Sequence, residues 1–227
     1  MQVNSPQASS TIALDIIGTC FSLAAPGRRL QELGAPEQTL ELWFAQTLRD
    51  AFALSHAGGY RPLKEMLSAE LPRTLLRAGV KADPQAVSSV VATFAELEPQ
   101  PGLREALSRA AESGVKLLAL TNGSAESTRR LLERAGVLDR FAALLSCDQI
   151  RRTKPHPDVY AMARREAEGE LWLVAAHAWD IAGALMAGLR SAYITEHEGA
   201  YLDGVYPAAD LTAATLEEAV AAVLARA

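Results

Sequence analysis

The sequence has no excess of positive charge. Its 22 Lys and Arg residues stand against 27 Asp and Glu residues, which gives a formal net charge of −5 at pH 7. Proteins that hold nucleic acid by its backbone depend on cationic side chains that neutralise phosphates. The composition therefore offers no electrostatic basis for such binding, and we expect no nucleic-acid partner.

Long apolar runs, a basic N-terminus and abundant cysteine are also missing. No run approaches the roughly 20 apolar residues of a membrane-spanning helix. The first ten residues, MQVNSPQASS, are polar and uncharged, unlike a signal peptide, and we expect them to form a loose leader. Two cysteines, Cys20 and Cys147, are too few for a disulfide framework and are expected to be buried thiols. We therefore expect a cytoplasmic protein without a membrane partner.

The residues that are present suit an ordinary globular fold. Hydrophobic residues make up 49% of the 227 positions, which is enough for a sizeable core. Short apolar runs predict strands, and helical patterns separate the later ones. This alternation predicts an α/β fold with a Rossmann-like, doubly wound parallel sheet. The strands are expected within 11–19, 115–121, 141–147, 171–176 and 189–194, and the helices at 102–113, 124–135, 158–168 and 181–187.

The segment 24–97 has a different pattern. Apolar side chains spaced by three and four predict an amphipathic helix over 37–53, and 60–78 and 84–97 have helical patterns too. No strong strand is evident there. We therefore predict an inserted helical cap domain at 24–97, with linkers near 24–26 and 98–102. Residues 1–23 and 98–227 would then form the α/β core domain.

Polar residues follow the predicted strands. Ligands of an open parallel sheet bind beyond the carboxyl ends of its strands, so these residues are expected to converge. They are Asp15 and Thr19, Thr121 and Asn122, Lys154, and His177 and Asp180.

The pairing of Asp15 with Lys154 has a chemical rationale. A buried carboxylate costs several kcal/mol unless it is paired. Lys154 can keep Asp15 ionised and thus nucleophilic, and Asp180 can hold Lys154 in place. Asp180 could alternatively cap the helix expected to begin at 181. Donors for the nucleophile or for a bound anion would come from Thr19, Thr121 and Asn122.

The order of these residues resembles the haloacid dehalogenase superfamily. Its motifs stand here as Asp15-x-x-Gly18-Thr19, Thr121-Asn122, Lys154 and Asp180. The phosphatases of the superfamily carry a second Asp two residues after the nucleophile, as general acid and base, and paired acids at the last motif for Mg²⁺. Ile17 cannot transfer a proton, and Asp15 and Asp180 alone are a poor ligand set for a hard cation.

These departures favour the type II 2-haloacid dehalogenase branch. That branch resembles this sequence at Lys154-Pro-x-Pro-x-x-Tyr160 and at Ala-Trp179-Asp180. It also has an arginine in the first cap helix, which implies that Arg49 and Asn122 receive the departing halide. Other arginines that compete for this role are Arg28, Arg29, Arg61 and Arg73.

One departure concerns the hydrolytic step. The best-known dehalogenases of the branch have serine and asparagine where this sequence has Ala175 and His177. Ala175 cannot form a hydrogen bond through its side chain, whereas His177 can donate or accept one. We therefore expect the hydrolytic water to be bound differently in this protein, near Lys154, His177 and Asp180.

The resemblance implies hydrolytic dehalogenation of short 2-haloalkanoic acids to 2-hydroxy acids through an ester on Asp15. It implies no metal or organic cofactor, a small anionic substrate and a homodimer. A Mg²⁺-dependent phosphatase or phosphonate hydrolase and a catalytically silent anion-binding relative are the alternatives. The expected catalytic residues are Asp15, Thr19, Arg49, Lys154, His177 and Asp180, and the expected substrate-binding residues are Thr121, Asn122, Tyr160 and Trp179.

Overall fold

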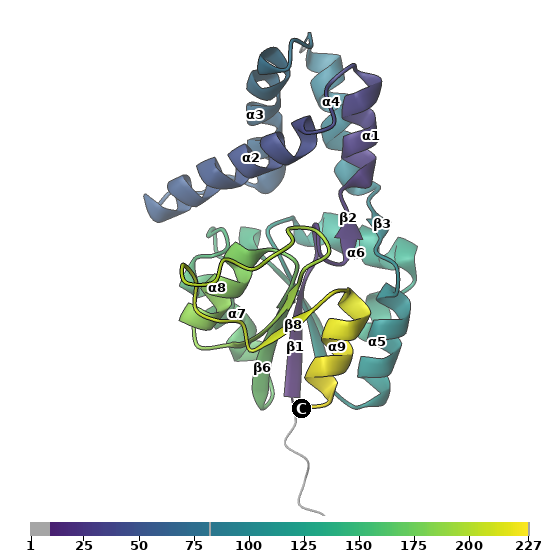
Figure 1. Cartoon of the computed structure of the whole chain (residues 1–227), viewed down its shortest axis with the longest axis vertical. Coiled ribbons are helices and arrows are strands. Elements are labelled where there is room, and N and C mark those ends of the chain that lie inside the picture. Colours follow the sequence, from purple (N-terminus) through teal and green to yellow (C-terminus); the bar gives the residue numbers. More distant parts are fainter. Residues whose placement is uncertain (1–9, 82, 227) are drawn as a thin grey trace, which may run out of the picture.

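The computed structural model describes residues 10–81 and 83–226, and a six-stranded parallel sheet lies at its centre (Figure 1). Every neighbouring pair of strands in this sheet is parallel. In spatial order the strands are β5 (Ala143–Ser146), β4 (Lys116–Thr121), β1 (Ser10–Asp15), β6 (Glu170–Ala175), β7 (Arg190–Ile194) and β8 (Leu211–Ala213).

Helices cover both faces of the sheet, as the doubly wound prediction required (Figure 1). One face packs against α5 (Leu103–Glu112), α6 (Ala125–Ala135) and α9 (Leu216–Leu224), and the other against α7 (Pro157–Glu166) and α8 (Ala178–Met186). Successive side chains of a strand point to opposite faces. Ile12 and Leu14 therefore belong to the first apolar layer, and Ala13 belongs to the second.

The five predicted strands are all present, with shifts at their ends. The first is shorter than expected, because the chain leaves the sheet after Asp15 and turns through Gly18, whose φ is 85°. Ser10 already belongs to β1, while the rest of the expected leader lies outside the described residues. Sequence reasoning missed β8, which is three residues long, partly exposed at the sheet edge and therefore without an apolar run.

A block of helices stands above the carboxyl edge of the sheet (Figure 1). Its members are α1 (Ala24–Glu32), α2 (Thr39–His56), α3 (Leu63–Arg77), α4 (Pro84–Ala92) and the 3₁₀ turn η1 (Thr93–Ala95). Trp43, Leu67 and Val90 are buried in an apolar core of its own. The linker predicted at 24–26 was wrong, because these residues form the first turn of α1, where Pro26 is tolerated without a backbone N–H.

A short antiparallel ribbon joins the helical block to the sheet. It pairs β2 (Phe21–Ser22) with β3 (Glu98–Pro99), so the chain enters and leaves the block at neighbouring points. The ribbon holds the block over the end of β1. The division into a cap at 24–97 and a core at 1–23 and 98–227 stays a prediction, with this ribbon at its boundary. No helix in the described part of the chain has the length and apolar character needed to cross a bilayer.

Candidate active site

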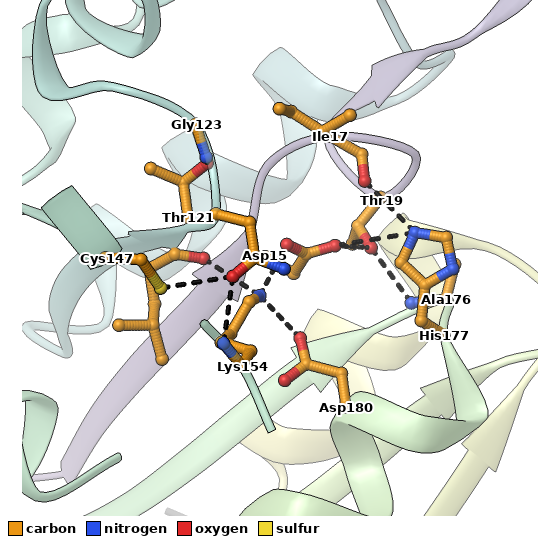
Figure 2. Close-up of polar contacts among 12 residues, drawn as sticks. Asp15, Ile17, Thr19, Thr121, Gly123, Cys147, Lys154, Ala176, His177 and Asp180 are labelled. Atoms are coloured by element: carbon orange, nitrogen blue, oxygen red, sulfur yellow. Dashed lines mark hydrogen bonds and ion pairs between the residues drawn. The ribbon is translucent and has the colours of Figure 1, made fainter. Parts of the chain in front are cut away.

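Asp15 ends β1 and lies almost completely buried beside Lys154 (Figure 2). The Lys154 Nζ is 2.6 Å from Asp15 Oδ1 and 2.6 Å from Asp180 Oδ2. It also donates to the carbonyl oxygen of Leu120 over 3.2 Å. The predicted convergence of these three charged residues is thus present, with one ammonium group between two carboxylates.

The electrostatics of this cluster favour a charged lysine. Burial alone lowers the pKa of Lys154, but the charges of Asp15 and Asp180 outweigh it and raise the pKa above its usual value. Burial raises the pKa of Asp180, and Lys154 opposes that shift without cancelling it. Lys154 therefore stays protonated near neutral pH, and its ammonium group contacts one oxygen of Asp15 and one of Asp180.

Thr19 holds the second oxygen of the Asp15 carboxylate. Its hydroxyl donates to Asp15 Oδ2 over 2.6 Å and accepts the backbone N–H of Ala176 over 3.0 Å. Because Ala176 directly follows β6, the neighbouring strand orients the hydroxyl. Both oxygens of Asp15 thus have a fixed donor, and the carboxylate is held in one orientation before any substrate binds.

Tyr160 supports Asp180 from behind. Its hydroxyl donates to Asp180 Oδ1 over 2.6 Å, and the side chain is completely buried. It lines neither of the pockets near Asp15, and substrate binding by Tyr160 stays a prediction. The alternative role of Asp180 as a helix cap was wrong: α8 begins at Ala178, and the Asp180 side chain points to Lys154 and Tyr160 instead of capping the helix.

Thr121 and Asn122 differ in their hydrogen bonds and in whether they line the inner pocket. The Thr121 hydroxyl accepts the backbone N–H of Gly123 over 2.9 Å, and this side chain lies outside both pockets. Substrate binding by Thr121 stays a prediction. Asn122 does line the pocket beside Asp15. Its Oδ1 accepts the backbone N–H of Lys154 over 3.0 Å and lies 3.1 Å from Cys147 Sγ. The side-chain NH₂ of Asn122 is therefore available to a ligand.

Sequence reasoning missed Glu198, the partner of His177. The two oxygens of Glu198 lie 2.7 Å from His177 Nδ1 and 2.8 Å from the backbone nitrogen of Ala178. His177 Nε2 lies 3.1 Å from the Ile17 carbonyl oxygen and 4.0 Å from Asp15 Oδ2. Glu198 follows β7 in a loop without a motif, so no local pattern could have identified it.

Two adjacent cavities lie next to Asp15 and His177. A small inner pocket of about 10 Å³ reaches Asp15, and an outer cleft of about 880 Å³ opens beside it. Phe44 and Leu48 from α2, together with His177 and Trp179, line both and form the wall between them. The remaining residues around the inner pocket are Asp15, Ile17, Leu63 and Asn122.

Arg49 faces the outer cleft, not the inner pocket. Its side chain is 56% exposed and pairs with the neighbouring Asp50 over 2.8 Å. Successive helical residues are about 100° apart around the axis, so a helix that turns Leu48 toward the inner pocket turns Arg49 away. The structure thus does not place Arg49 where a halide would leave Asp15. The competing arginines Arg28, Arg29, Arg61 and Arg73 line neither space.

The donor set does not fit Mg²⁺. The oxygens of Asp15 are engaged by Lys154 and Thr19, and those of Asp180 by Lys154 and Tyr160. A hard cation needs several free oxygen ligands and would have to displace the ammonium group. In the described parts of the chain, no three His, Cys, Asp or Glu side chains lie together in a way that could hold a metal ion.

Comparison with known proteins identifies the family. The sequence model of the haloacid dehalogenase-like hydrolases matches residues 11–188. The chain belongs to this family of hydrolases. It is 27% identical over 196 residues to haloacetate dehalogenase H-2 of Moraxella sp. (strain B), covering 84% of this chain and 87% of that relative.

Two further comparisons are informative. The L-2-haloacid dehalogenase from Xanthobacter autotrophicus, solved with chloropropionic acid covalently bound, superposes with a TM-score of 0.84 at 22% identity, over 96% of this chain and 100% of that chain. Phosphatase MT3486 of Mycobacterium tuberculosis (strain CDC 1551 / Oshkosh) is 36% identical over 164 residues, covering 70% of each chain. The fold and the hydrolase family predicted from the sequence are confirmed.

Proposed function

We propose that this hydrolase removes the halogen of short 2-haloalkanoic acids through a covalent ester on Asp15, without a metal. The observation that carries the proposal is the Asp15 carboxylate at the wall of an apolar pocket, held by Lys154 and Thr19, with Ile17 where a proton-transferring acid would stand. The haloacetate dehalogenase relative and the structural neighbour with covalently bound chloropropionic acid support it.

The first step is a displacement at carbon. The ionised Asp15 attacks C2 of the substrate, a carbon–oxygen bond forms, and the halide leaves with the electron pair of the carbon–halogen bond. Attack opposite the halide inverts the configuration at C2. Lys154 and Thr19 contribute by keeping the carboxylate charged and oriented, so little rearrangement is needed on the way to the transition state.

The second step is hydrolysis of the ester. Water attacks the carboxyl carbon of Asp15, and the negative charge develops on oxygens that already face Lys154 and Thr19. The 2-hydroxy acid leaves with an oxygen from Asp15, and one proton is released. That proton passes to solvent water, because Asp180 lies behind Lys154 and lines neither pocket.

Isotope labelling tests the covalent route. In a single turnover in H₂¹⁸O, we expect ¹⁸O in Asp15 and unlabelled oxygen in the hydroxy acid, both measured by mass spectrometry. Label that enters the product directly would contradict the ester. Asp15→Asn should reduce halide release to background, because an amide is a far weaker nucleophile. Asp139→Asn, at an exposed surface position, is the matched control and should retain full activity.

A metal-dependent phosphatase is the second candidate, because a relative at 36% identity is a phosphatase. Ile17 and the fully engaged oxygens of Asp15 and Asp180 argue against it. Release of nitrophenol from p-nitrophenyl phosphate that requires Mg²⁺ would favour the phosphatase. Stabilisation by chloroacetate in a thermal shift, without halide release, would instead indicate an anion-binding relative without catalysis.

The location and the assembly of the chain are proposals as well. We infer a cytoplasmic protein from Cys20 and Cys147, which are buried free thiols. The homodimer rests on the family resemblance alone, and sedimentation at micromolar concentration tests it.

A further inference from the structure

The inner pocket has to accommodate negative charge. A haloacid carries a carboxylate, and its halogen leaves as an anion. Lys154 is already held between two carboxylates, and Arg49 faces the outer cleft. Among the described residues that line the inner pocket, His177 is the one side chain that can supply a positive charge near Asp15.

The contacts of the His177 ring require a proton on both nitrogens. Nδ1 faces a Glu198 oxygen at 2.7 Å, and Nε2 faces the Ile17 carbonyl oxygen at 3.1 Å. A carboxylate and a carbonyl oxygen only accept hydrogen bonds, so each nitrogen has to donate. The ring is therefore an imidazolium in this arrangement, and it is not available as a base while Asp15 is free.

The groups packed around His177 favour that charge. Glu198 from the loop after β7 and Asp15 from β1 are negative, and Lys154 lies behind Asp15 as the opposing charge. The ring of Trp179 stacks on His177 at 5.3 Å between centroids, and that of Phe44 lies at 6.0 Å. Burial lowers the pKa of His177, but Glu198 and Asp15 outweigh it and raise the pKa above its usual value.

We propose that His177, held as an imidazolium by Glu198, binds the negative charge of the ligand in the inner pocket, and that Glu198 is its positioning residue. The Nε2–H bond to Ile17 is the longer of the two and ends on a neutral oxygen, so an entering anion can draw this hydrogen to itself. The nature of the anion, a haloacid carboxylate or its departing halide, rests on the proposed function.

Glu198 is anchored independently of the anion. Its second oxygen accepts the Ala178 N–H at the start of α8, so the carboxylate is fixed in front of Nδ1. Gln at position 198 keeps the shape and the bond to Ala178 but removes the negative charge. Glu198→Gln is therefore the variant that separates charging of the imidazole from packing.

Binding of unreactive anions tests the proposal without turnover. Sodium acetate and sodium bromide are titrated separately into the protein between pH 5.5 and 9, with the tryptophan fluorescence as the signal. One pH unit above the His177 pKa only about a tenth of the rings keep their charge, so we expect the affinity there to be about tenfold below its low-pH value. The pH at which the affinity begins to fall is called the break below. Glu198→Gln should move this break to lower pH, and His177→Asn should abolish it.

His197→Asn is the matched control, because His197 lines the outer cleft and contacts Gln100. It should leave the break unchanged. The imidazole C–H resonances, assigned with His177→Asn, report the pKa of His177 directly. A response to acetate identifies the carboxylate as the anion, and a response to bromide alone identifies the halide. Binding of both anions that is independent of pH, or a break that Glu198→Gln does not move, would overturn the proposal.

The two proposals fail in different ways. If halide release is absent but the break in anion binding moves with Glu198→Gln, dehalogenation is wrong and the role of His177 stands. If halide release is normal and the break is missing, only the role of His177 is wrong.

Discussion

Gly18 lies in the turn after Asp15 and packs directly against the His177 ring. Its φ of 85° lies in the left-handed region, and a Cβ built there would lie 2.6 Å from His177 Nε2. A side chain at this position would thus meet two obstacles, a strained backbone and the imidazole. The motif glycine is required for turn geometry and also for the space that His177 occupies.

Gly18→Ala should therefore damage activity more than backbone strain explains. Gly34 has the same φ of 85° but open space around its Cβ position, which makes Gly34→Ala a matched control. Both variants should lose about 1–2 kcal/mol in the free energy of unfolding by urea. Only Gly18→Ala should also lower kcat/KM for chloroacetate, by roughly a hundredfold, since it displaces His177. Equal activity in the two variants would mean that the ring position is unimportant.

At the scale of the element, the orientation of α2 determines which of its side chains line the inner pocket beside Asp15. The helix turns Phe44 and Leu48 toward the inner pocket and leaves Arg49 on the side of the outer cleft. Leu42 lies on the far side of the same helix and is 45% exposed. The rotation of α2 about its axis thus makes the wall above Asp15 apolar and limits the size of the inner pocket.

Leu48→Ala should relax selection by substrate size. Removing this side chain enlarges the inner pocket, so kcat/KM for 2-chloropropionate should rise severalfold relative to that for chloroacetate. The loss of a buried leucine should also destabilise the protein by about 2–5 kcal/mol, measured by urea unfolding. Leu42→Ala should change neither value appreciably. A substrate ratio unaltered by Leu48→Ala would show that α2 does not set the size limit.

At the scale of the whole molecule, the helical block is fastened to the loop that carries Lys154. Tyr60, between α2 and α3, donates a hydrogen bond to Asp148, and Ser55 Oγ accepts the Thr153 N–H over 3.1 Å. The inner pocket of about 10 Å³ has room for about one water. A haloacid therefore needs side-chain rearrangement or separation of the block from the sheet edge before it can reach Asp15.

Tyr60→Phe should make that separation easier. The variant loses the hydrogen bond to Asp148, so the closed arrangement is less favoured and KM for chloroacetate should rise. If product release limits turnover, kcat should rise as well, by a fewfold. Tyr201→Phe, which removes an exposed hydroxyl that donates to the carbonyl oxygen of Pro207 in the loop after β7, is the control for steady-state kinetics. Unchanged kcat and KM in Tyr60→Phe would indicate that this contact does not restrain opening.

Local sequence determined much of this protein. Apolar runs of strand length and helical spacing are properties of neighbouring residues, and burial follows from them; the parallel sheet, the helical block and the acid at the end of β1 were therefore predictable. The order of the motifs also predicted that Asp15, Lys154 and Asp180 converge, because parallel strands end at one edge. Predicting these features does not require the rotation of each element relative to its neighbours.

Only the tertiary structure decided the partners of the individual side chains. Glu198 reaches His177 from a loop without a motif, Tyr160 faces Asp180 instead of the pocket, and α2 turns Arg49 outward. Each outcome depends on packing between elements that are distant in the sequence. A small rotation of a helix exchanges which side chain it presents, and local periodicity fixes the spacing of side chains but not that rotation.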